Sequence, residues 1–96
     1  MVVRRGKRYG GARLVTSILL TGEERAPRFG FIVSKQVGNA VVRNTVRRRL
    51  KDVSARSLSS LPAGADIVFR AMPAAAEASF DELLEDVTRV CSRATP

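Results

Sequence analysis

The sequence predicts an α+β fold, because strand-like segments alternate with two helical patterns in a chain of 96 residues. Alternating apolar and β-branched residues indicate strands, and apolar residues three or four positions apart indicate helices. A chain of this size forms one domain, residues 1–96, since a second domain would have no core of its own. Its hydrophobic fraction of 45% is typical of a globular protein and not of a disordered tail.

Four segments carry strand patterns. They are residues 7–9, 12–21, 28–34 and 66–71. In the third segment Phe29, Phe31 and Val33 share one face by the period of two. Only a short loop separates the second and third segments, so we expect these two to pair antiparallel. The fourth segment is a short central strand that Pro73 ends.

Two segments carry helical patterns. The first, residues 40–57, follows Asn39, whose side-chain oxygen can accept a hydrogen bond from an orphan backbone N–H group. The second follows a capping box formed by Ser79 and Glu82. Cys91 falls on the apolar stripe of this second helix, which indicates a buried structural thiol. As the only cysteine of the chain it cannot form an internal disulfide.

The polar side of the first helix is almost entirely cationic. Arg43, Arg47 and Lys51 recur every four residues and form one ridge, with Asn44 and Arg48 on the neighbouring ridge. The side expected to dock on the sheet comprises Val42, Val46, Leu50 and Val53. Like charges at this spacing destabilise an isolated helix by a few tenths of a kcal/mol per pair. A solvated face normally mixes signs, so this ridge indicates a polyanionic partner.

The charge is divided unevenly along the chain. The net charge is +8, and residues 1–56 hold 14 Lys and Arg against three acids, whereas residues 57–96 hold three against six. One cationic surface on a neutral-to-acidic support makes nucleic acid the default partner. An anionic membrane is the competitor, but the basic helix lacks the bulky apolar face of an interfacial anchor. With no apolar run of spanning length and no signal peptide, we expect a cytoplasmic protein.

The residue types present argue against protein-borne catalysis. The chain has no His, so it has neither a Ser–His nor a Cys–His pair, and one Cys without His excludes a zinc site. We expect no catalytic residues and no metal ligands. The side chains left for RNA contact are Lys35, Arg43, Asn44, Arg47, Arg48, Lys51, Arg8 and Arg28. The roles of Arg49, toward the side of the helix, and of Tyr9, a base-stacking ring or an ordinary strand aromatic, stay open.

The stretch SKQVGNAVVRNTVRRRLK, residues 34–51, resembles the signature of the bacterial ribonuclease P protein component. In that family a Ser-Lys pair ends a strand, and a Gly-Asn turn precedes an Ala-Val-x-Arg-Asn run that opens an Arg- and Lys-rich helix. The resemblance is specific in order, spacing and residue type over the central part of the chain. The flanks agree with the family in pattern only.

This resemblance implies a two-layer α–β sandwich with a mixed four-stranded sheet and a left-handed crossover through the basic helix. It implies the small subunit of ribonuclease P, which removes the 5′ leader of precursor tRNA while the RNA subunit, with bound magnesium, performs the hydrolysis. The expected partners are ribonuclease P RNA and the leader, without a membrane, DNA or a cofactor held by protein side chains. The basic helix would brace the RNA subunit, and a cleft between the sheet and an N-terminal helix would bind the leader.

Two departures from the family pattern change these expectations. The family begins with a longer segment whose helix packs over the sheet, whereas this chain starts MVVRRGKRYGG. We therefore expect the N-terminal helix to be missing, with Val2 and Val3 as its remnant. Thr45 stands where the family often has a third basic residue, so we expect fewer phosphate contacts there.

Two alternatives come from other classes of protein. One is a general or ribosome-associated RNA-binding module without a processing role. The other is a DNA-binding protein that places the basic helix in a major groove. The string of residues 34–51 argues against both.

Overall fold

The computed structural model describes residues 5–94, which form four strands and two α-helices with two short 3₁₀ segments between them. The elements in chain order are β1 Arg5–Tyr9, β2 Leu14–Leu20, β3 Arg28–Ile32, α1 Ala40–Ser57, η1 Leu58–Ser60, β4 Ala65–Ala71, η2 Pro73–Glu77 and α2 Phe80–Ala94. Each predicted segment corresponds to one of them, and α1 has the predicted bounds. Val2 and Val3 lie outside the described residues.

The strands form one sheet in the order β1-β2-β4-β3. β2 is antiparallel to both β1 and β4, and β3 is parallel to β4. The prediction that the second and third strand segments pair is therefore wrong, because β4 lies between them. The β2–β3 loop passes the start of β4 and is held there by two hydrogen bonds. Gly64 N donates to the carbonyl oxygen of Arg25 at 2.7 Å, and the side-chain Oγ1 of Thr21 donates to the carbonyl oxygen of Gly64 at 2.7 Å.

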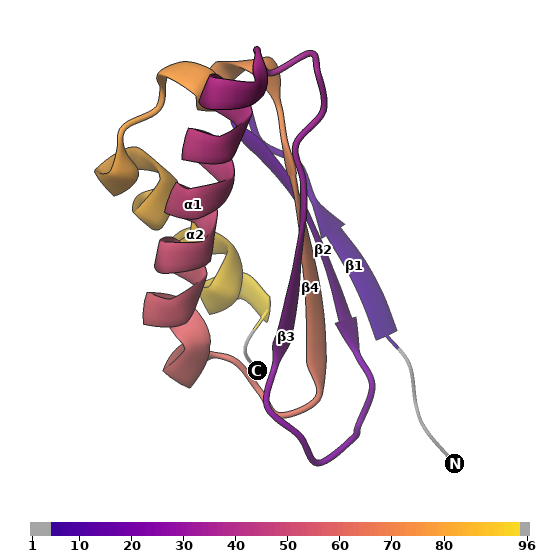
Figure 1. The fold of residues 1–96 in the computed structure, drawn as a ribbon. Coiled ribbons are helices and arrows are strands. Elements are labelled where there is room, and N and C mark those ends of the chain that lie inside the picture. Colours follow the sequence, from indigo (N-terminus) through magenta and orange to yellow (C-terminus); the bar gives the residue numbers. More distant parts are fainter. Residues whose placement is uncertain (1–4, 95–96) are drawn as a thin grey trace.

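The parallel pair β3 and β4 is connected through α1. This crossover is left-handed (Figure 1), the hand that the family resemblance implies and the opposite of the usual preference. It brings the end of β3 and the start of α1 to one edge of the molecule, where the basic helix lies above the outer strand.

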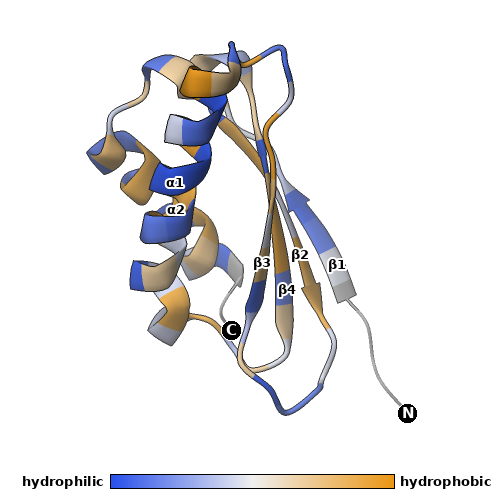
Figure 2. Ribbon diagram, viewed as in Figure 1, coloured by the Kyte–Doolittle hydropathy of each residue, from blue (hydrophilic) through white to orange (hydrophobic). Residues whose placement is uncertain are grey.

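Both helices lie on the same side of the sheet (Figure 1), with α1 in contact with β3 and α2 in contact with β2. Figure 2 shows that strands β2 and β4 are mostly hydrophobic, whereas the middle turns of α1 are hydrophilic. At the centre of the core Phe69 stacks between Phe29 and Phe31, with ring centroids 6.1 and 6.0 Å away. The other buried side chains include Leu14, Ile18, Val46, Leu50, Val53, Ile67, Leu83, Val87 and Cys91.

The second helix begins at the predicted capping box. The Glu82 backbone N donates to Ser79 Oγ at 3.1 Å, and the Ser79 backbone N donates to Glu82 Oε1 at 3.0 Å. Arg13, from the turn between β1 and β2, bridges to this helix through Glu82 Oε2 at 2.7 Å and Asp86 Oδ2 at 2.8 Å. Burial raises the pKa of the Cys91 thiol, as expected for a structural cysteine. Neither α-helix among residues 5–94 combines the length and apolarity that crossing a bilayer requires.

Candidate nucleic-acid interface

The start of α1 is fixed by two residues of the preceding turn. Asn39 has an extended backbone and its Oδ1 accepts a hydrogen bond from Val42 N at 3.0 Å, as predicted for an N-cap. Gly38 packs against the same valine so closely that a Cβ atom there would lie 2.9 Å from Val42 Cβ. These contacts set the rotation of the helix about its axis, and thereby the direction of every basic side chain on it.

The α1 helix presents three different sides. The side on the sheet is apolar, and Val46, Leu50 and Val53 are at most 1% exposed there. The side toward α2 carries Arg49 and Arg56, and the side above the β3 edge carries the predicted ridge of basic residues.

The two arginines on the α2 side have intramolecular partners. Arg49 Nη1 donates to the carbonyl oxygen of Ala78 at 2.8 Å, just before α2 begins. The guanidinium of Arg56 lies over the Phe80 ring, 4.8 Å from its centroid, which is a cation–π distance. The role of Arg49, which the sequence left open, is therefore to tie α1 to α2.

The ridge on the third side, formed by Arg43, Arg47 and Lys51, faces away from α2. Among residues 5–94 no carboxylate forms an ion pair with these three side chains or with Arg48. Arg47 Nη1 instead donates to Asn44 Oδ1 at 3.3 Å, which joins the two neighbouring ridges. The structure thus presents four basic side chains and an amide on one rigid helix without internal neutralisation.

Arg43 differs from the other ridge residues at its Nε atom. The residue is half-buried, and its Nε atom is buried without a hydrogen-bond partner among the described residues. A buried donor without an acceptor costs free energy, about 1–3 kcal/mol in typical cases.

Lys35 lies in the turn between β3 and α1. The turn is closed by Val37 N, which donates to the carbonyl oxygen of Ser34 at 3.1 Å, and Lys35 is exposed on it. The lysine therefore precedes the ridge at the end of the helix where α1 begins, as predicted, and adds a further cation there.

The face of the sheet turned away from the helices is uncovered within the described residues (Figure 1). The register aligns Arg8, Ser17, Val68 and Gly30 in one row across all four strands. In the adjacent row Arg70 lies between Val15 and Ile32. We call this surface the open face. Tyr9 pairs with the buried Thr16 and packs on the opposite, helix-covered face, which favours an ordinary strand aromatic over a base-stacking ring.

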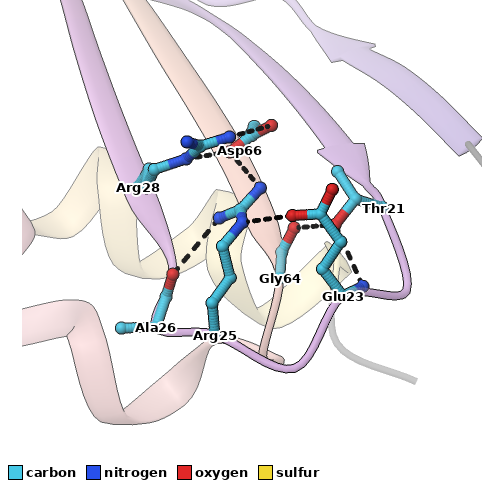
Figure 3. A network of polar contacts seen from close by, with 7 residues as sticks. All are labelled: Thr21, Glu23, Arg25, Ala26, Arg28, Gly64 and Asp66. Carbon is cyan, nitrogen blue, oxygen red and sulfur yellow. Dashed lines mark hydrogen bonds and ion pairs between the residues drawn. The ribbon is translucent and has the colours of Figure 1, made fainter.

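Arg28 lies on the open face but has an internal partner (Figure 3). Its Nε donates to Asp66 Oδ1 at 3.1 Å, and Arg25 Nη2 donates to the same oxygen at 2.8 Å. Glu23 holds the other edge of Arg25, with Oε2 2.6 Å from Nε. The hydrogen bonds of Arg28, and then of Arg25, hold the pKa of Asp66 below its usual value. Arg28 is therefore partly neutralised, whereas Arg8 has no ion-pair partner among the described residues.

Sequence reasoning missed Arg70. The period of two in Ala65–Ala71 places Asp66, Val68 and Arg70 opposite the buried Ile67 and Phe69. That pattern could have identified an exposed cation on a central strand. Arg70 is exposed and, within residues 5–94, forms no ion pair.

Metal-binding chemistry finds no support in these side chains. Among the described residues no three acidic, His or Cys side chains gather as a metal site. The carboxylates of Asp66, Glu82 and Asp86 are instead bonded to arginines. A divalent ion therefore does not fit the described side chains.

The family model for Ribonuclease P matches residues 1–95. The chain belongs to the ribonuclease P protein family. A ribonuclease P protein component from Clavibacter michiganensis subsp. michiganensis is 47% identical over 94 residues, which cover 98% of this chain and 83% of that protein. The component from Acidothermus cellulolyticus is 45% identical over 95 residues, 98% of this chain and 79% of that protein. This chain is accordingly a subunit of the ribonucleoprotein endoribonuclease ribonuclease P and assists 5′ maturation of tRNA.

Solved structures of ribonuclease P proteins share the fold. The RNase P protein from Thermotoga maritima has a TM-score of 0.81 at 24% identity and covers 92% of this chain and 85% of its own. The protein from Staphylococcus aureus has a TM-score of 0.79 at 25% identity, with 93% and 81% covered. The α+β architecture with a mixed four-stranded sheet, predicted through the family resemblance, is thereby confirmed.

Proposed function

We propose that the α1 ridge binds the ribonuclease P RNA. The observation that carries this proposal is that four cations of α1 form no ion pair with any carboxylate of residues 5–94. They are Arg43, Arg47, Arg48 and Lys51. Arginine forks can contact phosphate oxygens with two hydrogen bonds each. Asn44 is suited to a ribose or a base edge, because its amide both donates and accepts.

The open face is proposed to bind the 5′ leader of precursor tRNA. It lies on the other side of the sheet from α1, so the protein would hold the RNA subunit and the substrate at once. Lys35 and Arg8 would add phosphate contacts at the margins of these two surfaces. Arg28 would contribute less, since Asp66 already neutralises it in part.

The protein is proposed to supply binding and no catalytic groups. Magnesium would be held by the RNA subunit, which would perform the hydrolysis in the cytoplasm. The protein's cations would lower the repulsion between two polyanions and so reduce the magnesium concentration that cleavage requires. Residues 1–96 would act as a single RNA-binding domain without DNA or membrane partners.

Reconstitution tests this function directly. The protein is added to a bacterial ribonuclease P RNA at low magnesium, and cleavage of precursor tRNA is measured. We expect strong stimulation by the wild-type protein and by Arg93→Ala, which removes an exposed cation from the end of α2. We expect weak stimulation by an Arg47→Ala/Lys51→Ala variant. Absence of stimulation by the wild type would favour a general RNA-binding module instead.

A further inference from the structure

Two glycines on the open face are not required by the fold. A Cβ atom on Gly30 would lie 3.6 Å from Val68 Cγ2, and one on Gly6 would lie 3.8 Å from Leu19 Cδ1, which are ordinary van der Waals distances. Neither glycine has a positive φ. Glycine inside a strand weakens it and often accompanies the close approach of a ligand. At these two positions the surface of the sheet is therefore lower than the backbone conformation requires.

The low part of the surface is bordered by two cations. Arg8 on β1 and Arg70 on β4 are separated by β2, about 10 Å across the sheet, and Arg70 lies two residues further along the strands than the row of Arg8. Both are exposed and, within residues 5–94, neither has an ion-pair partner. A hollow of about 370 Å³ lies beside Arg8, and its lining includes Ser17, Val68 and the bare Gly6. Asp66 also lines it, but Arg25 and Arg28 already pair with that carboxylate.

Aromatic rings are absent from the described part of the open face. Tyr9, Phe29, Phe31 and Phe69 all lie on the helix-covered face, where they pack on the core or form part of it. The open face instead offers aliphatic side chains such as Val68 and Ile32, 37% and 43% exposed. Stacking on aromatic rings is the usual means by which proteins hold unpaired bases. A strand on this face would be held mainly by its phosphates.

We propose that Arg8 and Arg70 are a phosphate-binding pair that guides a single RNA strand across Ser17, Val68 and Gly30. This inference rests on the proposed function, in which the leader lies on the open face. It adds that leader binding depends on leader length and not on base identity. Arg70 thereby gains a role in substrate binding, and Gly30 a role in keeping the path clear.

The test uses the reconstituted holoenzyme and substrates with leaders of two or ten nucleotides, the longer one all-uridine or all-adenosine. We expect Arg70→Gln and Arg8→Gln each to lower affinity for both long leaders roughly five- to tenfold, as for loss of a charge-assisted hydrogen bond. Affinity for the two-nucleotide leader should stay within about twofold. Arg70→Lys should retain most of the affinity, and Arg93→Gln should change nothing.

Gly30→Val separates binding from folding. We expect its melting temperature to equal or exceed that of the wild type, because β-branched residues favour strands. Its affinity for long leaders should nevertheless fall several-fold. Gly30→Ala, whose added atom fits without displacement, should show the same direction with a smaller loss.

The outcomes distinguish the two levels of the proposal. A wild-type holoenzyme that binds long and short leaders equally would overturn both the leader site and the Arg8–Arg70 pair. A wild type that prefers long leaders, with Arg70→Gln and Arg8→Gln unchanged, would overturn the pair alone. A several-fold difference between uridine and adenosine leaders would overturn the independence from base identity, since it would indicate that bases are read.

Discussion

Arg49 on α1 donates from Nη1 to the carbonyl oxygen of Ala78, 2.8 Å away and directly before the capping box of α2. This contact divides the cations of α1 by function. Those on the α2 side position one helix against the other, whereas those above the β3 edge have no internal anion partner in the described structure. Replacing an arginine on the α2 side should therefore mainly reduce stability, whereas replacing one above the β3 edge should mainly reduce RNA binding.

Replacing Arg49 with Gln should reduce stability more than RNA binding. The change leaves a half-buried carbonyl without its donor, so the free energy of unfolding should fall by about 1–2 kcal/mol in urea denaturation. Arg48→Gln, one position away and exposed, should stay within about 0.5 kcal/mol. A large loss of affinity in folded Arg49→Gln without any loss of stability would place this arginine in the RNA interface.

Replacing Arg47 and Lys51 with Ala should weaken binding to ribonuclease P RNA and flatten its salt dependence. Each lost phosphate contact should reduce the slope of log K against log salt by about 0.7–0.9. The slope is obtained from binding titrations between low and moderate salt, with Arg93→Ala as a control that removes one cation from outside the ridge. An unchanged slope in the double variant would remove the ridge from the interface.

Stability should fall in acid, in part through Asp66 and Glu82. The pKa of Asp66 is lowered by hydrogen bonds from Arg28 and Arg25. The pKa of Glu82 is lowered by the hydrogen bond from the Ser79 backbone and then by the positive charge of Arg13. A carboxylate whose pKa is lower in the folded state stabilises the fold at pH values above its unfolded-state pKa of about 4. This stabilisation is lost as the pH falls through the folded-state pKa.

The Asp66→Asn variant isolates the contribution of Asp66. It should be less stable than the wild type at pH 7, and this difference should narrow as the pH falls below about 4 and the native carboxylate is protonated. Urea denaturation at several pH values measures the difference. A difference that widens as the pH falls would contradict the assignment to the charged carboxylate.

Two buried serines of α1 should respond differently to replacement by Ala. Ser54 Oγ is buried and finds no hydrogen-bond partner within residues 5–94, whereas Ser57 Oγ donates to the carbonyl oxygen of Val53 at 3.1 Å. Ser54→Ala should therefore raise the free energy of unfolding by up to about 1 kcal/mol, because it removes an unsatisfied hydroxyl and favours the helix. Ser57→Ala should give a smaller gain or a loss. The reverse order in thermal denaturation would show that Ser54 is satisfied in solution.

Local features of the fold were predictable from the sequence because their causes lie a few residues apart. Asn39 and Ser79 cap helices through neighbours three positions away, so the start of α1 and the capping box of α2 could be read directly. The pairing of strands depended on segments far apart. The patterns of β2 and β3 are the same whether these strands are adjacent or separated by β4, so a rule for consecutive strands gave the wrong neighbour.

The candidate site shows the same division. The direction of Arg47 and Lys51 followed from helical period alone, but the role of Arg49 depended on where α2 packs. The partial neutralisation of Arg28 depended on Asp66, 38 positions later, which the parallel β3–β4 register places directly beside it. The alternation in DIVFRA did contain the signal for Arg70, since it places that arginine on the solvent side of a central strand.

The insertion of β4 between β2 and β3 has a consequence for biosynthesis. A nascent polypeptide that ends before Ala65 holds two strands with an unfilled gap between them, next to a strongly basic helix that has no finished sheet to pack on. We therefore expect stable structure only after nearly the whole chain has left the ribosome, since non-local pairing must wait for its last partner. Until then the arginine-rich segment is exposed to any RNA nearby.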